Sequence, residues 1–223
     1  TTICKFRNAL IKNNLLESIF KEVKNSMIEK NLILNEGTLV DATLIHSSEP
    51  KKRKDENGKT ISNKANDEDA SYTSKRGRKH HGYKIHIATD TNSIIKEVIT
   101  TTAKTHDSTQ FDELIKDETK AVFADSGYMS QERKRTLRSK GIFNGITERR
   151  VRGQSKLRTK QSKNNTKFSK VRALVELPFA FIKKLMKYTE TKYLGLHKNS
   201  QHVFLIAAAY NLRRMPNLIQ RCE

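Results

Sequence analysis

Three carboxylates stand in parts of the sequence where an acidic side chain is unusual. Asp41 lies in the middle of residues 38–45, an apolar segment that alternates as a strand does. Asp125 directly follows the apolar residues 121–124. An ionised carboxylate in such surroundings is unfavourable unless a divalent cation, an arginine or a set of backbone N–H donors compensates its charge. Asp125 also fits a simpler role, because Asp-Ser-Gly is an ordinary turn sequence.

The third carboxylate, Glu176, lies in residues 168–188, a segment with helical periodicity. Arg172 precedes it by one helical turn and Lys183 follows it by two, so the three side chains project from one side of the predicted helix. An ordinary ion pair on a solvated helix surface would use the same spacing, and this alternative stays open. Pro178 lacks a backbone donor and predicts a kink just after Glu176.

Together, the three carboxylates could bind divalent cations. Phosphoryl transfer on DNA places charge on both the attacking and the leaving oxygen, and two Mg²⁺ ions about 4 Å apart stabilise both. Such hard cations prefer oxygen ligands. Two strands and a helix are a minimum scaffold for the pair. Because spacing alone does not show that the side chains converge, a metal site at Asp41, Asp125 and Glu176 is a hypothesis at this point.

The elements that must position these residues form a mixed α/β pattern. Residues 46–81 carry no apolar period and are interpreted as a mobile, charged insertion. Hydrophobic periodicity, turn residues and caps predict the following elements, in chain order: a helix over 11–31, a strand over 38–45, a hairpin of strands over 83–88 and 94–101, a helix from a capping box at Asp107 and Gln110 through 115, a strand over 121–125, a helix over 130–140, a strand over 142–147, a basic loop, a helix over 168–188, and a helix over 200–215 ended by Pro216.

The charge of the chain points to a polyanionic partner. Lys and Arg number 44 against 24 acidic residues, for a formal net charge of +20. Such a surplus repels itself unless a polyanion neutralises it, and nucleic acid is the usual one. A lysine-rich composition that only aids solubility is the alternative. Clustering argues against it, because residues 149–170 contain basic residues and no acidic one: Arg149, Arg150, Arg152, Lys156, Arg158, Lys160, Lys163, Lys167 and Lys170. We expect this surface to bind DNA phosphates in a salt-sensitive way.

Other chemistries find weaker support. Cys4 and Cys222 form neither a disulfide framework nor a zinc motif. Neighbours such as His106, Asp107 and Ser108 rarely face one another as a hydrolase triad does, so we assign Asp107 to helix capping. No apolar run is long enough to span a membrane, and no signal peptide opens the chain, so we expect an intracellular protein.

Several ordered motifs resemble a known family. The motifs are residues 37–45 (GTLVDATLI), 82–90 (GYKIHIATD), 124–128 (ADSGY) and 172–179 (RALVELPF), with the polar stretch 67–75 and the ending 194–199 followed by the helix over 207–213. They are similar to the DDE transposases of bacterial insertion sequences, in the insertion-sequence-five group. The resemblance runs from about Thr2 to Met215, nearly the whole chain.

The resemblance implies a ribonuclease-H-like mixed sheet flanked by helices, with a short N-terminal helical segment. It implies an acidic triad of Asp41, Asp125 and Glu176 that holds two Mg²⁺ ions, for which Mn²⁺ would substitute. The family's helix signature, Tyr-x₂-Arg-x₃-Glu-x₆-Lys, is met by Arg172, Glu176 and Lys183, which implies that the two basic residues contact DNA phosphates. The tyrosine position holds Ser169, a departure that concerns handling of the DNA end.

The resemblance places Lys84 and His86 in the second strand of the fold. This placement argues against a transition-metal site built from His80, His81 and His86. Lys84 joins the expected DNA contacts.

The domain organisation is expected to follow the same pattern. Residues 1–36 are interpreted as the truncated tail of a helical N-terminal region, residues 37–215 as the catalytic domain and residues 216–223 as a tail. With only that tail of the N-terminal region, recognition of transposon ends would be weakened or lost. We expect a homo-oligomer on DNA in the bacterial cytoplasm, associated with the nucleoid, with no membrane contact.

The resulting hypothesis is metal-dependent cleavage at transposon ends followed by strand transfer into target DNA, without a covalent enzyme intermediate. Two alternatives remain. A catalytically inactive DNA-binding remnant of a transposase would bind DNA without cutting it. A structure-selective nuclease on the same fold would cut at junctions without joining strands.

Overall fold

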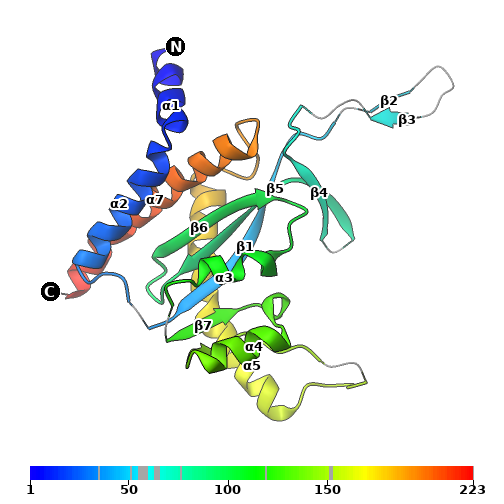
Figure 1. Ribbon diagram of the computed structural model, residues 1–223, viewed down its shortest axis with the longest axis vertical. Coiled ribbons are helices and arrows are strands. Elements are labelled where there is room, and N and C mark those ends of the chain that lie inside the picture. Colours follow the sequence, from blue (N-terminus) through cyan, green and yellow to red (C-terminus); the bar gives the residue numbers. More distant parts are fainter. Residues whose placement is uncertain are drawn as a thin grey trace.

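A six-stranded mixed sheet forms the centre of the computed structural model, with helices on both faces (Figure 1). The structure describes residues 1–34, 36–50, 52–54, 60–62, 66–75, 77–118, 120–150 and 153–222. Its strands are β1 (Thr38–His46), β2 (Lys52–Lys54), β3 (Thr60–Ser62), β4 (Ser71–Lys75), β5 (Arg78–Thr89), β6 (Ile95–Thr102), β7 (Ala121–Ala124) and β8 (Phe143–Asn144). Its longer helices are α1 (Thr2–Lys12), α2 (Leu15–Glu29), α4 (Gln131–Ser139), α5 (Thr159–Arg172) and α7 (Leu196–Cys222).

The strand order within the sheet is β4-β5-β1-β7-β8, and β6 also pairs with β5. β1 pairs antiparallel with β5 and parallel with β7, and β7 pairs parallel with β8. The predicted hairpin is β5–β6, and its antiparallel pairing is confirmed. A mixed sheet flanked by helices confirms the predicted ribonuclease-H-like class of fold. The separate pair β2–β3 lies outside this sheet.

Alternation along the strands separates two hydrophobic cores. Ile87 of β5 belongs to the core beneath α2 and α7, whereas its neighbour Ala88 belongs to the core on the opposite face. Successive side chains of a strand point to opposite faces, so one strand can supply both cores. The opposite face is covered by α4 and by the short helices η1 (Asp107–Gln110), α3 (Phe111–Leu114) and η2 (Ser126–Tyr128).

The first helical segment is broken in two, and the prediction of one helix over 11–31 is wrong. Asn14 has a left-handed backbone (φ 54°) between α1 and α2, a conformation that asparagine adopts more readily than most residues. α2 lies along α7 (Figure 1) and buries Phe20 in the main core. The N-terminal segment therefore packs directly against α7 and the main core.

Two predicted helix boundaries are also wrong. α5 begins at Thr159, nine residues before the expected start, inside the stretch interpreted as a basic loop. It has no buried residue, so it offers no apolar period to detect. α7 continues through Pro216 to Cys222. Leu218, beyond the proline, is buried against α2, and this packing offsets the lost backbone hydrogen bond.

Part of the expected insertion over 46–81 is ordered as sheet. β4 pairs antiparallel with the first residues of β5. Buried Asp67 ties the segment down, because its carboxylate accepts hydrogen bonds from the Tyr83 hydroxyl (2.7 Å) and from the backbone N–H of Gly195 (3.1 Å). Residues 51, 55–59, 63–65 and 76 lie outside the described residues. The strand predicted over 142–147 is shorter in the structure, where only β8 (Phe143–Asn144) forms.

Candidate active site

The register of two parallel strands brings Asp41 and Asp125 together. Val40 of β1 lies opposite Ala124, the last residue of β7, and an aspartate follows each of them in the chain. The preceding pair, Leu39 and Phe123, faces the same side as the aspartates by alternation. Phe123 contacts Phe168 of α5, with ring centroids 6.0 Å apart. Both carboxylates therefore face α5.

Arg172, the last residue of α5, lies beside Asp125 and acts electrostatically on Asp41. Its Nη1 is 3.6 Å from Oδ1 of Asp125. Burial raises the pKa of the Asp41 carboxyl, and the neighbouring Asp125 raises it further. The backbone N–H of Ala42, which donates to Asp41 Oδ1 (2.8 Å), and the Arg172 guanidinium both act in the opposite direction. The site thus holds two negative charges close together and one cation that partly offsets them.

Asp125 also makes the turn that its sequence predicts. Its Oδ1 accepts from the backbone N–H of Ser126 (2.6 Å) and caps the short helix η2. The contacts with Arg172 and with the Thr147 hydroxyl (3.5 Å) use the same oxygen. The side chain is half exposed. Within the described part of the chain, Oδ2 is left available for a further ligand, so the turn and a metal site are compatible.

Glu176 stands at the edge of this arrangement. It opens α6 (Glu176–Ala180), one turn after Arg172, and its side chain is exposed. The preceding turn η3 (Ala173–Val175) lies against β1 and β5, with Val175 fully buried. Among the residues that the structure describes, no three His, Cys, Asp or Glu side chains lie close enough to form a metal-binding group. The structure brings Asp41, Asp125 and Arg172 together and leaves Glu176 facing solvent.

The helix that carries Glu176 changes its winding on both sides of that residue. A 3₁₀ turn, η3, precedes it, and a π-helical turn, η4 (Phe181–Leu185), follows Pro178. Proline removes a backbone donor, and π-turns are frequent at functional sites. The irregular winding lies where the sequence predicts a kink.

Of the two lysines expected to contact DNA near the site, one is already paired. Lys84 on β5 lies 2.8 Å from Asp107 and donates to the Thr105 carbonyl (2.7 Å). Lys183, on η4, is partly buried, and burial lowers the pKa of its ammonium group, with a smaller effect from Lys75. Lys75, which acts electrostatically on both Asp41 and Lys183, was not predicted from the sequence, because β4 lies in the stretch interpreted as an insertion.

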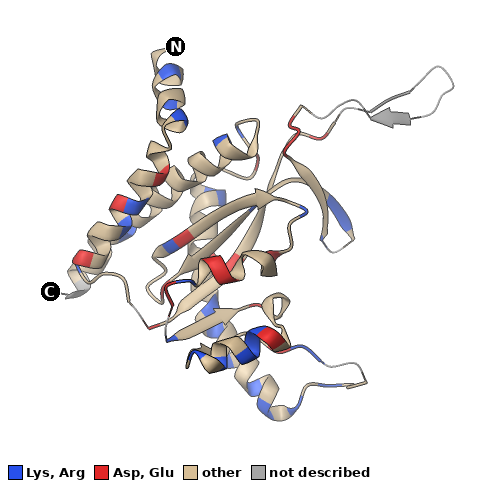
Figure 2. Cartoon of the chain, viewed as in Figure 1, with Lys and Arg blue, Asp and Glu red and all other residues tan. Residues whose placement is uncertain are grey.

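Basic residues follow the lower edge of the molecule in Figure 2, over α4, α5 and the described part of the segment before α5, and those within residues 149–170 are called the basic cluster. Arg149 reaches the site, since its Nε donates to the Ser126 hydroxyl (3.0 Å) beside Asp125. Arg150 donates to the Ser155 carbonyl (3.0 Å). Lys156 and Arg158 are exposed, whereas Arg152 lies outside the described residues.

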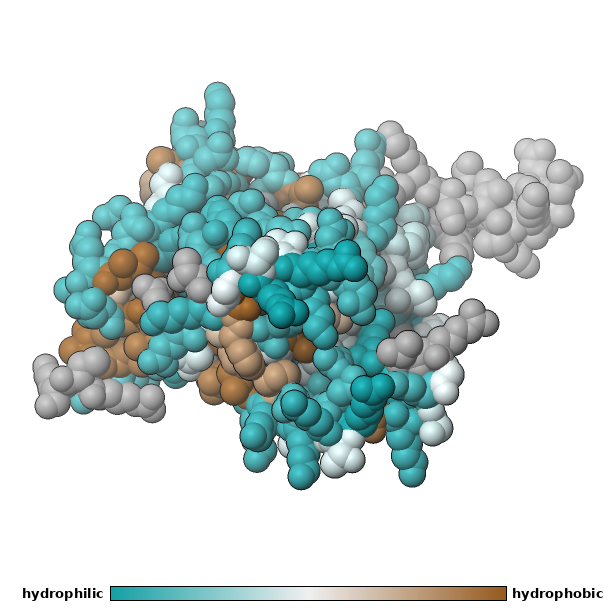
Figure 3. Space-filling model, turned by 60° about the horizontal axis from the view of Figure 1, so that its bottom comes forward, coloured by the Kyte–Doolittle hydropathy of each residue, from teal (hydrophilic) through white to brown (hydrophobic). Residues whose placement is uncertain are grey.

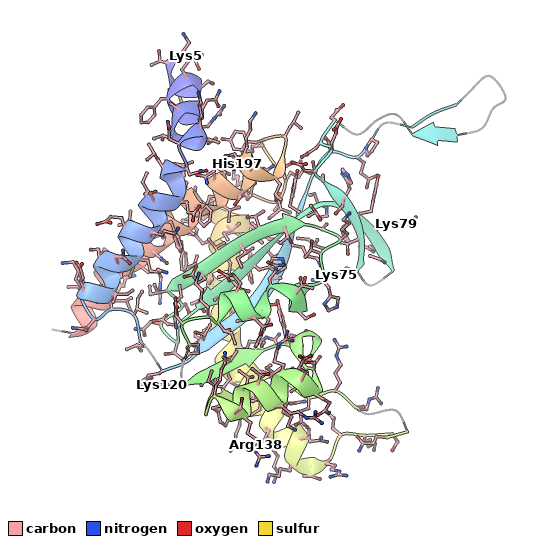
Figure 4. The ribbon with its side chains drawn as sticks, viewed as in Figure 1. Lys5, Lys75, Lys79, Lys120, Arg138 and His197 are labelled. Atoms are coloured by element: carbon pink, nitrogen blue, oxygen red, sulfur yellow. The ribbon has the colours of Figure 1, made fainter. Side chains whose placement is uncertain are left out.

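Figure 3, which brings this lower part forward, shows a surface made mainly of hydrophilic side chains. Arg138 projects from α4 on the same edge (Figure 4) and lines a cavity of about 750 Å³ between α4 and α5. Cationic helices on both sides of such a hollow suit a phosphate backbone.

The structure corrects the role of Asp107. The N-cap of η1 is His106, whose Nδ1 lies 2.7 Å from the Ser108 hydroxyl, and Asp107 pairs with Lys84 instead of opening a capping box. His86 is fully buried, with Nε2 2.9 Å from the Thr101 hydroxyl. Burial lowers the pKa of His86 to about 4.

Comparison with known protein families shows to which family the chain belongs. Two aspartates at the ends of a paired parallel register, beside a helix with an arginine and a glutamate one turn apart, lie in a fold of the ribonuclease-H-like class. The chain belongs to the transposase DDE domain family, whose model matches residues 34–212 and so spans all three carboxylates. The family assigns a transposase function. Comparison with solved structures found no match. None of the described helices is long and apolar enough to cross a membrane.

Proposed function

We propose that this chain cleaves DNA at the ends of a bacterial insertion sequence of the insertion-sequence-five group and transfers the cut strand into target DNA. Asp41, Asp125 and Glu176 are the proposed metal ligands. Bound Mg²⁺ ions, or Mn²⁺ in their place, would supply charge stabilisation on the attacking and leaving oxygens of the phosphodiester.

One observation carries this proposal: the parallel register of β1 and β7, which sets Asp41 and Asp125 side by side. Two carboxylates in such proximity are unfavourable without a cation, and burial of Asp41 increases that cost. Their donor set, carboxylate oxygens, suits Mg²⁺. Glu176 completes the set of ligands if its exposed side chain points toward Arg172, which lies one helical turn earlier in the chain.

The remaining residues would position DNA. The guanidinium group of Arg172 lies beside Asp125. It can exchange this carboxylate for a DNA phosphate, because guanidinium binds both groups in the same bidentate geometry. Lys183 lies two helical turns further along. Arg149, beside Ser126, connects the acidic site to the basic cluster. We propose that the DNA backbone follows this path. A homo-oligomer on DNA and association with the nucleoid also belong to the proposal.

The test is nicking of supercoiled plasmid in Mn²⁺ at low salt. Wild type is compared with Asp125→Asn, which keeps the shape of the side chain but removes its charge. Asp112→Asn is the matched control, because Asp112 is an exposed aspartate on α3. Wild type and Asp112→Asn should nick, and Asp125→Asn should bind plasmid without nicking it. Equal nicking by all three would overturn the site.

The same experiment addresses the alternative of an inactive DNA-binding remnant. The exposed position of Glu176 is the observation that favours it. DNA binding by wild type with no nicking under any divalent metal would support the remnant and contradict the catalytic proposal.

A further inference from the structure

A cavity of about 160 Å³ opens beside the first carboxylate. One wall is formed by residues 42–44 of β1, which directly follow Asp41. The facing wall is formed by residues 73–75 at the end of β4, and Lys84 and Asp107 complete the lining. The cavity therefore lies between the acidic site and the β4–β5 hairpin.

The charge inside the cavity is positive. Lys84 and Asp107 neutralise each other at 2.8 Å. Lys75, the other charged residue of the lining, is exposed, and no described carboxylate lies within ion-pair distance of it. Thr73, on the same face of β4 as Lys75, adds a hydroxyl hydrogen-bond donor. A lining of one unpaired ammonium group and a hydroxyl suits a phosphate group.

Lys75 also lies near a second cation. Burial is the main cause of the lowered pKa of Lys183, and the positive charge of Lys75 lowers it further. Two like charges from separate elements repel each other unless an anion lies between them. The anion is expected beside Asp41, where a DNA strand would be cut.

We propose that this cavity binds a backbone phosphate of the DNA strand held at the acidic site, with Lys75 as its charge partner and Thr73 as a hydrogen-bond donor. This inference rests on the proposed function, since it supposes that DNA lies at Asp41. It assigns to the β4–β5 hairpin a role in gripping the strand on the side opposite the basic cluster.

The experiment measures binding of a short labelled DNA duplex by fluorescence anisotropy, without metal, over a range of salt concentrations. The variant is Lys75→Gln, which removes the charge and keeps most of the length. Lys79→Gln is the matched control, because Lys79 lies on the same hairpin, is exposed and does not line the cavity. Figure 4 shows Lys75 on the side of the hairpin nearer the sheet and Lys79 directed away. Lys75→Arg keeps the charge and tests for rescue.

Loss of one phosphate contact reduces the slope of log affinity against log salt by about 0.9, which makes the fall in affinity from about 50 to 200 mM salt roughly 3.5-fold smaller. We expect this change in Lys75→Gln and wild-type slopes in Lys79→Gln and Lys75→Arg. A wild-type slope in Lys75→Gln overturns the phosphate site, and plasmid nicking by wild type then still supports the proposed function. A reduced slope without nicking by wild type retains the site and contradicts catalysis.

Discussion

Acidification should weaken the fold through the buried histidine beneath the site. His86 lies on β5 opposite Ala42, the residue after Asp41, and is fully excluded from solvent. Burial lowers its pKa from 6.5 to about 4, so the folded protein keeps the imidazole neutral where the unfolded chain protonates it. Stability from this residue is therefore complete above about pH 6.5 and is lost as the pH falls toward 4.

The size of the effect follows from the two pKa values. Between about pH 7.5 and about pH 5, a shift from 6.5 to 4 removes about 2 kcal/mol from the free energy of unfolding. Asp107 and Lys84 are the charged groups nearest the ring, and their mutual ion pair leaves burial as the dominant cause.

The assay is urea unfolding at these two pH values for wild type and His86→Gln, with His197→Gln as a histidine control outside the sheet. Wild type and His197→Gln should lose about 2 kcal/mol more on acidification than His86→Gln does. Equal losses in wild type and His86→Gln would refute the reasoning, because the histidine would then not be held neutral by burial.

Two further predictions concern the scaffold. Gly82→Ala should cost about 1–3 kcal/mol or more, because a Cβ at this left-handed position (φ +148°) would stand 2.1 Å from the Ile45 carbonyl and 2.8 Å from the Ser47 nitrogen; chemical denaturation measures the loss, and wild-type stability would contradict the strand geometry. Phe20→Ala should cost about 3–5 kcal/mol because Phe20 is 1% exposed in the main core, whereas Ile19→Ala, at a position 40% exposed, should cost far less. Equal melting temperatures for those two variants would show that α2 does not belong to the core.

The sequence predicted the sheet and two of the three carboxylate positions within it well, because β1, β5, β6 and β7 carry the β-branched or alternating patterns that strands require. Asp41 and Asp125 stand out since they interrupt those patterns. The proximity of the two aspartates depends on the register between β1 and β7, which lie more than 70 residues apart in the chain. No local pattern encodes that register.

Two of the elements that the sequence did not predict are polar and have no apolar period. α5 buries none of its side chains, and β4 is mostly exposed, so neither carries a hydrophobic signal. Lys75 was overlooked for this reason. The helix through Pro216 was cut short because packing of Leu218 against α2 is a tertiary effect that outweighs the local preference of proline.

The parallel pairing of β1 and β7 also has a consequence for how this chain could change length over evolution. Side chains of a strand alternate with a period of two, so one residue inserted ahead of either aspartate would turn its carboxylate to the opposite face. The segments just before Asp41 and Asp125 must therefore keep their length as well as their chemistry. Residues 153–158, which precede α5, pair with none of the described strands, and we expect insertions and deletions among relatives to accumulate there.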